Sequence, residues 1–428
     1  MRPLKVEQSA ALTGQLSMPG DKSISHRCAI LGALAFGQST FHNFLKSEDT
    51  LATLSVLSHL AVQLHLTNEN VLTVSGKGLK SLSPPVVQLD CCNAGTCARL
   101  ITGVLAAQSF TSELIGDASL MQRPQQRVAD PLNALGANVK TANGKMPVVI
   151  EPGSIKSGDF DLDSPSAQVK SALILAALCA GKSLSLSVST ASRDHTERLL
   201  EVFGAPIKYS PHHVALPPTT ELKAVNFTIP GDLSSCVFWC LAASIIPGSH
   251  IICQAVSLNP SRTHVFSVMK KMGAVIEIHS DNNVCEPAGD VHIYYPSEPL
   301  KSIELKADEA VSLIDEFPAL SVMAAFAQGT SIFRGLAELR HKESNRLDAI
   351  VQNLGKGGVS VELNKDTLII HGGGFVGGQM LSYGDHRIAM AFLIAGLATE
   401  KGVSLDDVSV IDISYPEFLS HLSTLSKK

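Results

Sequence analysis

The chain of 428 residues has no long hydrophobic run, although 45% of its residues are hydrophobic. Its apolar stretches reach roughly a dozen residues, whereas a helix needs about 20 to cross a bilayer. Stretches of this length suit helices buried in a protein core, so we expect no membrane-spanning segment. The N-terminus also lacks a charged segment followed by an apolar stretch and a small-residue cleavage site, which predicts that no signal peptide is present.

A strong excess of one charge sign is also absent. The chain has 34 Lys and Arg residues against 39 Asp and Glu residues, which gives a net charge of −5. Proteins that bind nucleic acids or membrane surfaces usually carry a basic excess or a basic patch. The composition therefore gives no reason to expect nucleic acid or a membrane as a partner.

Motifs for disulfides, metals and nucleotides are missing. The nine cysteines are an odd number, and Cys28, Cys179 and Cys240 lie inside apolar stretches. This distribution predicts reduced thiols and a cytoplasmic protein. Neither a CxxC pair nor an HExxH motif occurs, so we expect no metal site. The P-loop and the GxSxG nucleophile motif are absent as well.

The clearest positive feature is the stretch of residues 18–37. A Pro-Gly turn opens it, and apolar residues then recur at helical spacing from Ile24 to Ala35, which predicts a buried stripe. Lys22 and Arg27 add positive charge near the helix N-terminus, where free N–H groups and the helix dipole already favour an anion. Taken alone, such a stretch is more often an ordinary amphipathic helix with solvated charges.

The stretch is one of six. Similar Ala-rich apolar runs begin at Ser23, Gly95, Ser166, Ser234, Asp315 and Asp385, so consecutive starts lie 68 to 81 residues apart. Helices that are apolar on all sides are buried. A second, more polar type of helix is predicted after each run, at residues 47–61, 122–136, 192–204, 261–273, 342–355 and 414–426. Alternating stretches typical of half-buried strands follow the polar helices.

These patterns predict a repeated unit of a buried helix, a strand, an exposed helix and two or more strands. Six such units would form either one ring or two groups of three. The turns Pro19-Gly20 and Pro230-Gly231-Asp232 divide the chain so that three units lie between them. We therefore predict two domains, residues 20–232 and residues 1–19 plus 233–428, with residues 1–19 completing the sheets of the second domain.

Cations near the predicted helix starts are the candidates for an anion site. They are Lys22, Arg27, Arg123, Lys342, Arg346 and Arg387. If the helix ends face one interdomain cleft, so many cations would not stay unpaired without an anionic ligand. The alternative is a set of structural salt bridges. Asp315 opens a buried helix, so its carboxylate could likewise act only as an N-cap.

In chain order, eight motifs are similar to those of the 5-enolpyruvylshikimate-3-phosphate synthase family (3-phosphoshikimate 1-carboxyvinyltransferases): PGDKSISHR, NAGTCARL, GDASLxxRP, SAQVKSA, RDHTE, PGDxSS, LRxKESxR and GDHRIAM. The resemblance extends from Pro19 to the region of Phe418. It implies an α/β fold of two domains, an inverse α/β barrel-like arrangement of six βαβαββ repeats with three per domain, and an active site in the cleft between them. Two departures are Ile413, where many members carry Lys, and residues 98–101, which replace the common MRPL.

The resemblance also implies roles for individual residues. The catalytic residues would be Lys22, Asp315 and Glu343. Shikimate-3-phosphate would be bound by Lys22, Ser23, Arg27, Ser166, Ala167, Gln168, Arg193, Asp315 and Lys342. Phosphoenolpyruvate would be bound by Lys22, Asn93, Gly95, Arg123, Gln168, Lys342, Arg346 and Arg387.

The implied reaction transfers the enolpyruvyl group of phosphoenolpyruvate to the 5-hydroxyl of shikimate-3-phosphate and releases phosphate. This step of the shikimate pathway leads to chorismate and the aromatic amino acids, and it is the target of glyphosate. It requires an acid/base carboxylate pair and cations where charge changes, but no metal or other cofactor. We expect a cytoplasmic monomer. The alternatives are the sister transferase that acts on UDP-N-acetylglucosamine and a non-catalytic anion-binding protein.

Overall fold

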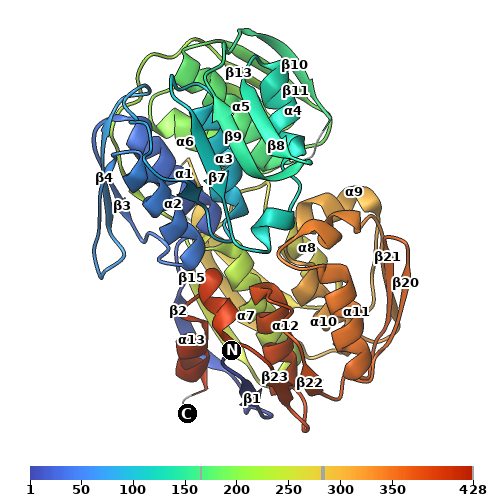
Figure 1. Ribbon diagram of the computed structural model, residues 1–428. Helices are drawn as coiled ribbons and strands as arrows, with labels where there is room; N and C mark the ends of the chain where they lie inside the picture. Colours follow the sequence, from blue (N-terminus) through green and yellow to red (C-terminus); the bar gives the residue numbers. More distant parts are fainter. Residues whose placement is uncertain (164–165, 281–284, 427–428) are drawn as a thin grey trace. The chain divides into compact units, whose positions relative to one another are not determined.

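The computed structural model describes residues 1–163, 166–280 and 285–426, and the chain divides into two compact units (Figure 1). Unit 1 comprises Met1–Pro19 and Pro230–Lys428, and unit 2 comprises Gly20–Ile229. Each unit has a hydrophobic core of its own. Helices and sheets alternate along the chain, which confirms the predicted mixed α/β class.

Unit 2 ends at Ile229, three residues before the predicted boundary at Asp232. The backbone N–H of Ile229 donates to the carbonyl of His42, which lies in unit 2 (3.0 Å). Two residues later, the N–H of Gly231 donates to the carbonyl of Ala255 in unit 1 (2.7 Å). The turn before Asp232 is therefore already bonded into unit 1.

The described residues of unit 2 form three four-stranded sheets with one common pattern. In each sheet the first pair of strands is parallel and the other two pairs are antiparallel. In spatial order, the strands of one sheet are β14 (Asn226–Thr228), β3 (Phe36–His42), β5 (Leu72–Lys77) and β4 (Gln63–Leu66). Those of another are β6 (Leu89–Asp90), β7 (Ser112–Ile115), β9 (Lys145–Glu151) and β8 (Asn138–Ala142). Those of the remaining sheet are β10 (Gly158–Leu162), β11 (Leu184–Val188), β13 (His213–Leu216) and β12 (Lys208–Ser210). Buried and less buried residues alternate along β5 and β9, as expected for strands with one face on a core.

In unit 1, the part of the chain that the structure describes forms two sheets of the same pattern and a smaller third one. The four-stranded sheets are β2 (Thr13–Ser17), β15 (His250–Ser257), β17 (Ala288–Tyr294) and β16 (Val275–Ser280); and β18 (Glu304–Leu305), β19 (Thr330–Phe333), β21 (Thr367–His371) and β20 (Ser360–Asn364). The third is β1 (Leu4–Val6), β23 (Val403–Leu405) and β22 (Gly378–Met380). The N-terminal strands β1 and β2 thus pair with strands from the second half of the chain.

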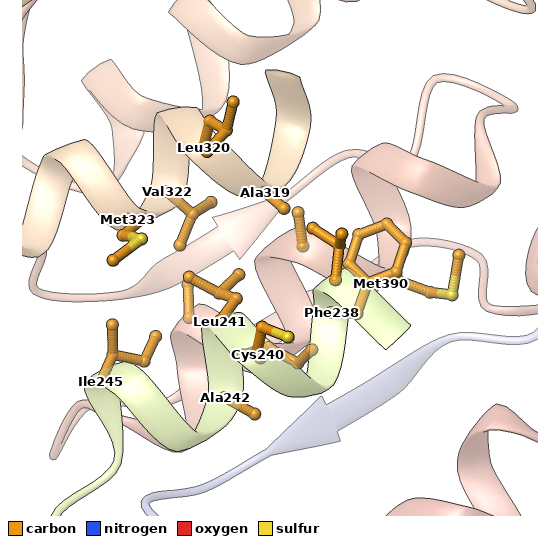
Figure 2. Close-up of a cluster of buried hydrophobic side chains, with 14 of the residues drawn as sticks. Phe238, Cys240, Leu241, Ala242, Ile245, Ala319, Leu320, Val322, Met323 and Met390 are labelled. Atoms are coloured by element: carbon orange, nitrogen blue, oxygen red, sulfur yellow. The ribbon is translucent and has the colours of Figure 1, made fainter. Parts of the chain in front are cut away.

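Among the described residues, three buried helices contribute to the core of each unit. In unit 2 they are α1 (Lys22–Leu34), α3 (Gly95–Leu105) and α5 (Ala167–Ala180), and in unit 1 they are α7 (Leu233–Ile245), α10 (Phe317–Phe326) and α12 (His386–Leu397). Figure 2 shows Leu241 and Ile245 of α7 beside Val322 and Met323 of α10, with Met390 of α12 near Phe238. These helices are apolar on nearly all sides because other elements cover them all round.

The second helix type begins one to four residues later than the sequence predicts. These helices are α2 (Glu48–His59), α4 (Gln126–Ala134), α6 (His195–Val202), α8 (His264–Lys271), α11 (Arg346–Lys356) and α13 (Phe418–Leu425). Short elements lie elsewhere, namely α9 (Ala307–Ala310) and the 3₁₀ turns η1 (Leu120–Gln122), η2 (Val311–Leu313), η3 (Ala337–His341) and η4 (Ser409–Ile413). Arg123 and Lys342 therefore lie between a 3₁₀ turn and a helix, not inside a helix. Within the described part of the chain, no helix is long and apolar enough to cross a membrane.

Candidate active site

The predicted site residues fall into two groups, one in each unit. The unit 2 group is Lys22, Ser23, Arg27, Asn93, Gly95, Arg123, Ser166, Ala167, Gln168 and Arg193, and the unit 1 group is Asp315, Lys342, Glu343, Arg346 and Arg387. Most of these residues lie at or just before a helix N-terminus. Free backbone N–H groups and the helix dipole favour negative charge at such positions.

Lys22 begins helix α1 and contacts a carboxylate that the sequence reasoning did not identify. Its Nζ lies 2.8 Å from Oδ2 of Asp49 in α2, and both side chains are largely buried. The helix start itself is capped by Asp21, whose Oδ1 accepts from the N–H of Ile24 (2.9 Å). The Lys22 ammonium is therefore held in one place by a neighbouring helix.

His26 lies on the same helix and is fully buried. Its Nδ1 lies 2.7 Å from Oγ1 of Thr53. Burial, and then the positive charges of Lys22 and Arg27, hold the pKa of His26 well below its usual range. His26 is therefore neutral near pH 7, and the positive charge at this end of α1 belongs to Lys22 and Arg27.

Arg27 is buried, and its guanidinium bonds to two other helices of unit 2. Nε donates to Oγ1 of Thr196 (2.7 Å) and Nη2 donates to Oγ of Ser171 (3.0 Å). Nη1 donates to the carbonyl of Ser23, one turn earlier in α1 (2.9 Å). The structure thus fixes the orientation of Arg27 through α5 and α6.

Asn93 and Arg123 lie side by side, although 30 residues separate them in the sequence. Nη2 of Arg123 donates to Oδ1 of Asn93, and the Asn93 amide donates to Oδ2 of Asp117 (2.6 Å). The other oxygen of Asp117 accepts from the N–H of Leu120 (2.7 Å). Asp117 therefore sets which end of the Asn93 amide faces Arg123.

Gly95 begins helix α3 between two guanidinium groups. A Cβ at this position would lie 3.2 Å from Nη1 of Arg123 and 3.3 Å from Nη1 of Arg99. Arg99 in turn donates to Oε1 of Gln168 (2.5 Å), and Nε2 of Gln168 donates to Oγ1 of Thr96 (2.9 Å). Gly95 thus leaves the space beside the two arginines open, and the starts of α3 and α5 are linked through Gln168.

The start of α5 offers backbone and hydroxyl groups. Ser166 is the N-cap of α5, and its Oγ accepts weakly from the N–H of Val169 (3.4 Å). Ala167 is the first helical residue. Arg193 is partly buried and lies two residues before the start of α6 at His195.

The unit 1 group is centred on Arg346, which is fully buried at the start of α11. Its three nitrogens contact three carboxylates: Nε lies 2.7 Å from Asp385, Nη2 lies 2.5 Å from Glu343, and Nη1 lies 3.2 Å from Asp315. Burial alone would lower the pKa of Arg346, but Asp385, Glu343 and Asp315 outweigh burial and raise this pKa. Arg346 therefore remains charged and joins the three carboxylates.

Asp315 is not an N-cap. The N-cap of α10 is Glu316, and the Asp315 carboxylate instead pairs with Lys342 (3.2 Å) and Arg346 (3.2 Å). Arg387, in the first turn of α12, donates from Nη1 to the carbonyl oxygen of Asp315 (2.9 Å). The N-cap role that the sequence left open for Asp315 is therefore wrong, because the N-cap lies one residue later.

Several cations of the two groups are paired with carboxylates of the chain, which the sequence did not predict. Lys22, Lys342 and Arg346 each contact at least one carboxylate. A buried charge without such a partner would cost several kcal/mol, roughly 3–5 when one partner is removed. Carboxylates of the chain thus already stabilise these cations, so an anionic ligand is not needed to explain their burial.

Several polar residues around the two groups were not assigned a role from the sequence. Besides Ser171 and Thr196, they include Asp49, Thr96, Arg99, Asp117 and Asp385. A signal existed for two of them, since Arg99 lies one helical turn after Gly95 and Asp385 opens the last buried helix. The contacts of Asp49 and Asp117 come from elements distant in sequence, so spacing alone could not reveal them.

A family model described as EPSP synthase (3-phosphoshikimate 1-carboxyvinyltransferase) matches residues 6–422. A 3-phosphoshikimate 1-carboxyvinyltransferase of Lactiplantibacillus plantarum is 40% identical over 432 residues, covering 100% of this chain and 99% of the relative. One from Desulforamulus reducens is 43% identical, with 95% of each chain covered.

Solved structures are similar as well. EPSP synthase from Acinetobacter baumannii has a TM-score of 0.86 and 36% identity, covering 99% of this chain and 97% of that one. The enolpyruvyl transferase NikO from Streptomyces tendae is 16% identical with a TM-score of 0.81, covering 100% of this chain and 98% of its own. At that identity the second likeness shows a shared fold only.

Proposed function

Because this chain belongs to the EPSP synthase family, we propose that its unit 1 group and its unit 2 group act together on the two substrates of the family's reaction. The chain transfers the enolpyruvyl group of phosphoenolpyruvate to shikimate-3-phosphate and releases phosphate, as a transferase of the shikimate pathway. UDP-N-acetylglucosamine is not favoured as the acceptor, because the matching family model and the relatives are 3-phosphoshikimate enzymes.

Shikimate-3-phosphate is assigned to the starts of α1, α5 and α6. Ser166, the backbone at Ala167, and Gln168 suit a phosphate, since a helix start presents N–H donors to an anion. Ser23, Arg27 and Arg193 supply further donors from unit 2. From unit 1, the carboxylate of Asp315 would accept hydrogen bonds from the hydroxyls of shikimate-3-phosphate, and the ammonium of Lys342 would bind a negatively charged group of the same substrate.

Phosphoenolpyruvate is assigned to Asn93, Gly95 and Arg123, together with Lys22 and Gln168 of the same unit. The support is the position of Gly95, where guanidinium nitrogens of Arg123 and Arg99 lie close enough to leave room for a Cβ only if they shift. From unit 1, the proposal adds Lys342, Arg346 and Arg387. Arginine guanidinium groups match the geometry of phosphate and carboxylate oxygens.

Lys22, Asp315 and Glu343 are proposed to carry the chemistry. The shikimate hydroxyl adds to C2 of phosphoenolpyruvate and gives its proton to Asp315, while a proton is delivered from Glu343 to C3. The resulting tetrahedral intermediate then loses one proton of its C3 methyl group to Glu343 and expels phosphate, which takes up the proton held by Asp315. Lys22 places a positive charge where the negative charge of the reacting groups changes.

The observation that carries this assignment is that one buried arginine holds both carboxylates. Asp315 and Glu343 each contact Arg346, yet their side chains remain 16% and 17% exposed while that of Arg346 is 0% exposed. A carboxylate that serves only a buried ion pair has no need to stay accessible. Partial exposure leaves both carboxylates accessible to a substrate, while the contact with Arg346 fixes their positions.

Isosteric variants test the proposed proton transfer. Asp315→Asn and Glu343→Gln keep the side-chain size and remove the ability to take up a proton, so each should lower kcat by roughly 10²–10⁴-fold. Phosphate release and calorimetric binding of shikimate-3-phosphate are measured in parallel, and binding should fall much less than kcat for Glu343→Gln.

A matched control is Glu304→Gln, which removes the carboxylate of an exposed ion pair with Arg334. Its kcat should stay near that of the parent chain. Near-normal turnover with a lowered melting temperature in either Asp315→Asn or Glu343→Gln would make that carboxylate a structural partner and overturn its assigned role. The monomeric state and the cytoplasmic location expected from the sequence are part of the proposal, and light scattering and cell fractionation test them.

A further inference from the structure

Directly behind the proposed shikimate-3-phosphate groups lies a buried polar cluster that the assigned chemistry does not use. It consists of Lys170 and Ser171 of α5 and Thr196 and Glu197 of α6, all fully buried or nearly so. Nζ of Lys170 lies 2.6 Å from Oε1 of Glu197, and their side chains are 3% and 1% exposed. We name these four residues the α5–α6 clamp.

The clamp accepts hydrogen bonds from two guanidinium nitrogens of Arg27. Thr196 Oγ1 accepts from Nε and Ser171 Oγ accepts from Nη2. The two hydroxyls also lie 2.6 Å from each other, within hydrogen-bonding distance. Arg27, Ser171 and Thr196 therefore form a closed triangle of hydrogen bonds between three helices.

Each corner of this triangle lies about one helical turn after a proposed ligand group. Arg27 follows Ser23 by four residues in α1, Ser171 follows Ala167 by four residues in α5, and Thr196 follows Arg193 by three residues at the start of α6. Residues three and four apart lie on the same side of a helix. The clamp is thus a buried layer directly beneath the groups proposed to meet the substrate.

We propose that Ser171 and Thr196, held together by the Lys170–Glu197 ion pair, are positioning residues that set the Arg27 guanidinium for shikimate-3-phosphate. The inference rests on the proposed function, because it assigns Arg27 to that substrate. A guanidinium on a long side chain has many rotamers, and ordering it at the moment of binding costs free energy. Two hydroxyl acceptors from different helices remove that freedom beforehand, and the buried ion pair keeps α5 and α6 in register.

Thr196→Val is the most direct test, because valine has nearly the same shape but lacks the hydroxyl. A hydrogen bond to a charged group is typically strong enough that its loss weakens binding roughly 10- to 100-fold. We expect the Kd of shikimate-3-phosphate, measured by calorimetry on the full chain, to rise within that range. We also expect kcat at saturating shikimate-3-phosphate and the KM of phosphoenolpyruvate to change less than about threefold, since Arg27 is not placed at the reacting atoms.

Two controls separate positioning from stability. Thr196→Ser restores the hydroxyl and should return the Kd to near that of the parent chain. Thr102→Val removes a buried hydroxyl in α3 that donates to Ala98 of its own helix, so it should lower the melting temperature without changing the Kd. Ser171→Ala removes the second acceptor and serves if Thr196→Val fails to fold.

A lowered melting temperature with unchanged Kd in both Thr196→Val and Ser171→Ala would overturn the inference. Arg27→Lys distinguishes that result from a failure of the proposed function. If Arg27→Lys weakens binding while both hydroxyl variants do not, Arg27 binds the substrate without help from the clamp. If Arg27→Lys leaves the Kd unchanged, the assignment of Arg27 to shikimate-3-phosphate is wrong, and the inference fails with it.

Discussion

Gly95 shows how a single missing side chain can define part of a site. The position begins α3, where glycine has no conformational necessity, since its φ lies outside the left-handed region. What glycine provides is space, because a Cβ would come within 3.2 Å of Arg123 and 3.3 Å of Arg99. Contacts that short require the guanidinium groups to move by a few tenths of an ångström.

We predict that Gly95→Ala raises the KM of phosphoenolpyruvate several-fold and weakens inhibition by glyphosate more strongly still. The added methyl group narrows the space beside Arg123, whereas the proposed shikimate-3-phosphate groups Ser23 and Arg27 belong to another helix, α1. Steady-state kinetics with varied phosphoenolpyruvate and glyphosate measure both effects, and calorimetry with shikimate-3-phosphate is the control. Unaltered affinities for both ligands would show that Gly95 does not line the phosphoenolpyruvate site.

At the residue scale, the sequence could identify which side chains are available but not how they are paired. The spacing of Lys22 and Arg27 indicated a charged helix start, and the structure confirms that helix. It could not indicate that Arg27 bonds to Thr196, because 169 residues separate the two. The same holds for Arg346 and Asp385, which are 39 residues apart and meet only in the fold.

At the scale of elements, the buried helices α3 and α5 owe their close packing to a glycine. A Cβ at Gly103 would lie 2.3 Å from the carbonyl oxygen of Ala172 and 2.7 Å from its Cα, both of which are backbone atoms. Backbone cannot yield as a flexible side chain can, so the helices would have to separate. The positions of Asn93 and Gln168 at the starts of these helices depend on the short distance between α3 and α5.

A pair of glycine variants tests this packing. Gly103→Ala should lower the stability of unit 2 by roughly 1–3 kcal/mol or more, as overpacking does in a tight core. Gly355→Ala is the matched control, because this helical glycine in α11 has no atom within 4 Å of an added Cβ. Alanine there should instead stabilise by about 1 kcal/mol, since it has the higher helix propensity.

Thermal unfolding followed by circular dichroism compares the two variants with the parent chain. The melting temperature should fall for Gly103→Ala and stay equal or rise for Gly355→Ala. Equal melting temperatures for all three proteins would mean that α3 and α5 can separate at little cost, and that the close approach at Gly103 is not needed.

Element positions were predictable from the sequence, whereas their ends were less so. The apolar runs identified the buried helices because a helix that is apolar on all sides has no polar face to turn toward water. The polar helices begin later than predicted because turns and bends occupy most of their expected first residues, after η1 ends at Gln122 and η3 ends at His341. A similar shift of one residue moved the N-cap of α10 from Asp315 to Glu316. That shift frees Asp315 to pair with cations.

At the scale of the whole molecule, the recurrence of helix types predicted a mixed α/β chain, and the repeated sheet pattern agrees with a chain built from similar segments. Two separate hydrophobic cores are consistent with two units that fold around their own helices. The exact residue at which the chain passes from unit 2 to unit 1, after Ile229, was not predictable. It depends on the backbone hydrogen bonds from Ile229 to His42 and from Gly231 to Ala255, which are distant in sequence. The arrangement of the two groups of site residues around the substrates stays a proposal.

We predict that the chain becomes more compact when shikimate-3-phosphate and glyphosate bind together. Lys22, Lys342 and Arg346 already contact carboxylates, so their positive charges are balanced without a ligand. Repulsion between these cations therefore cannot hold the two units apart. Compaction must then come from ligands that bind residues of both units more tightly in one arrangement than in another. Small-angle scattering should show a smaller radius of gyration with both ligands than with none, and Arg27→Lys should need higher ligand concentrations for the same change. An unchanged radius at saturating ligand would mean that substrates bind without relative movement of the units, and that the two groups act from fixed positions.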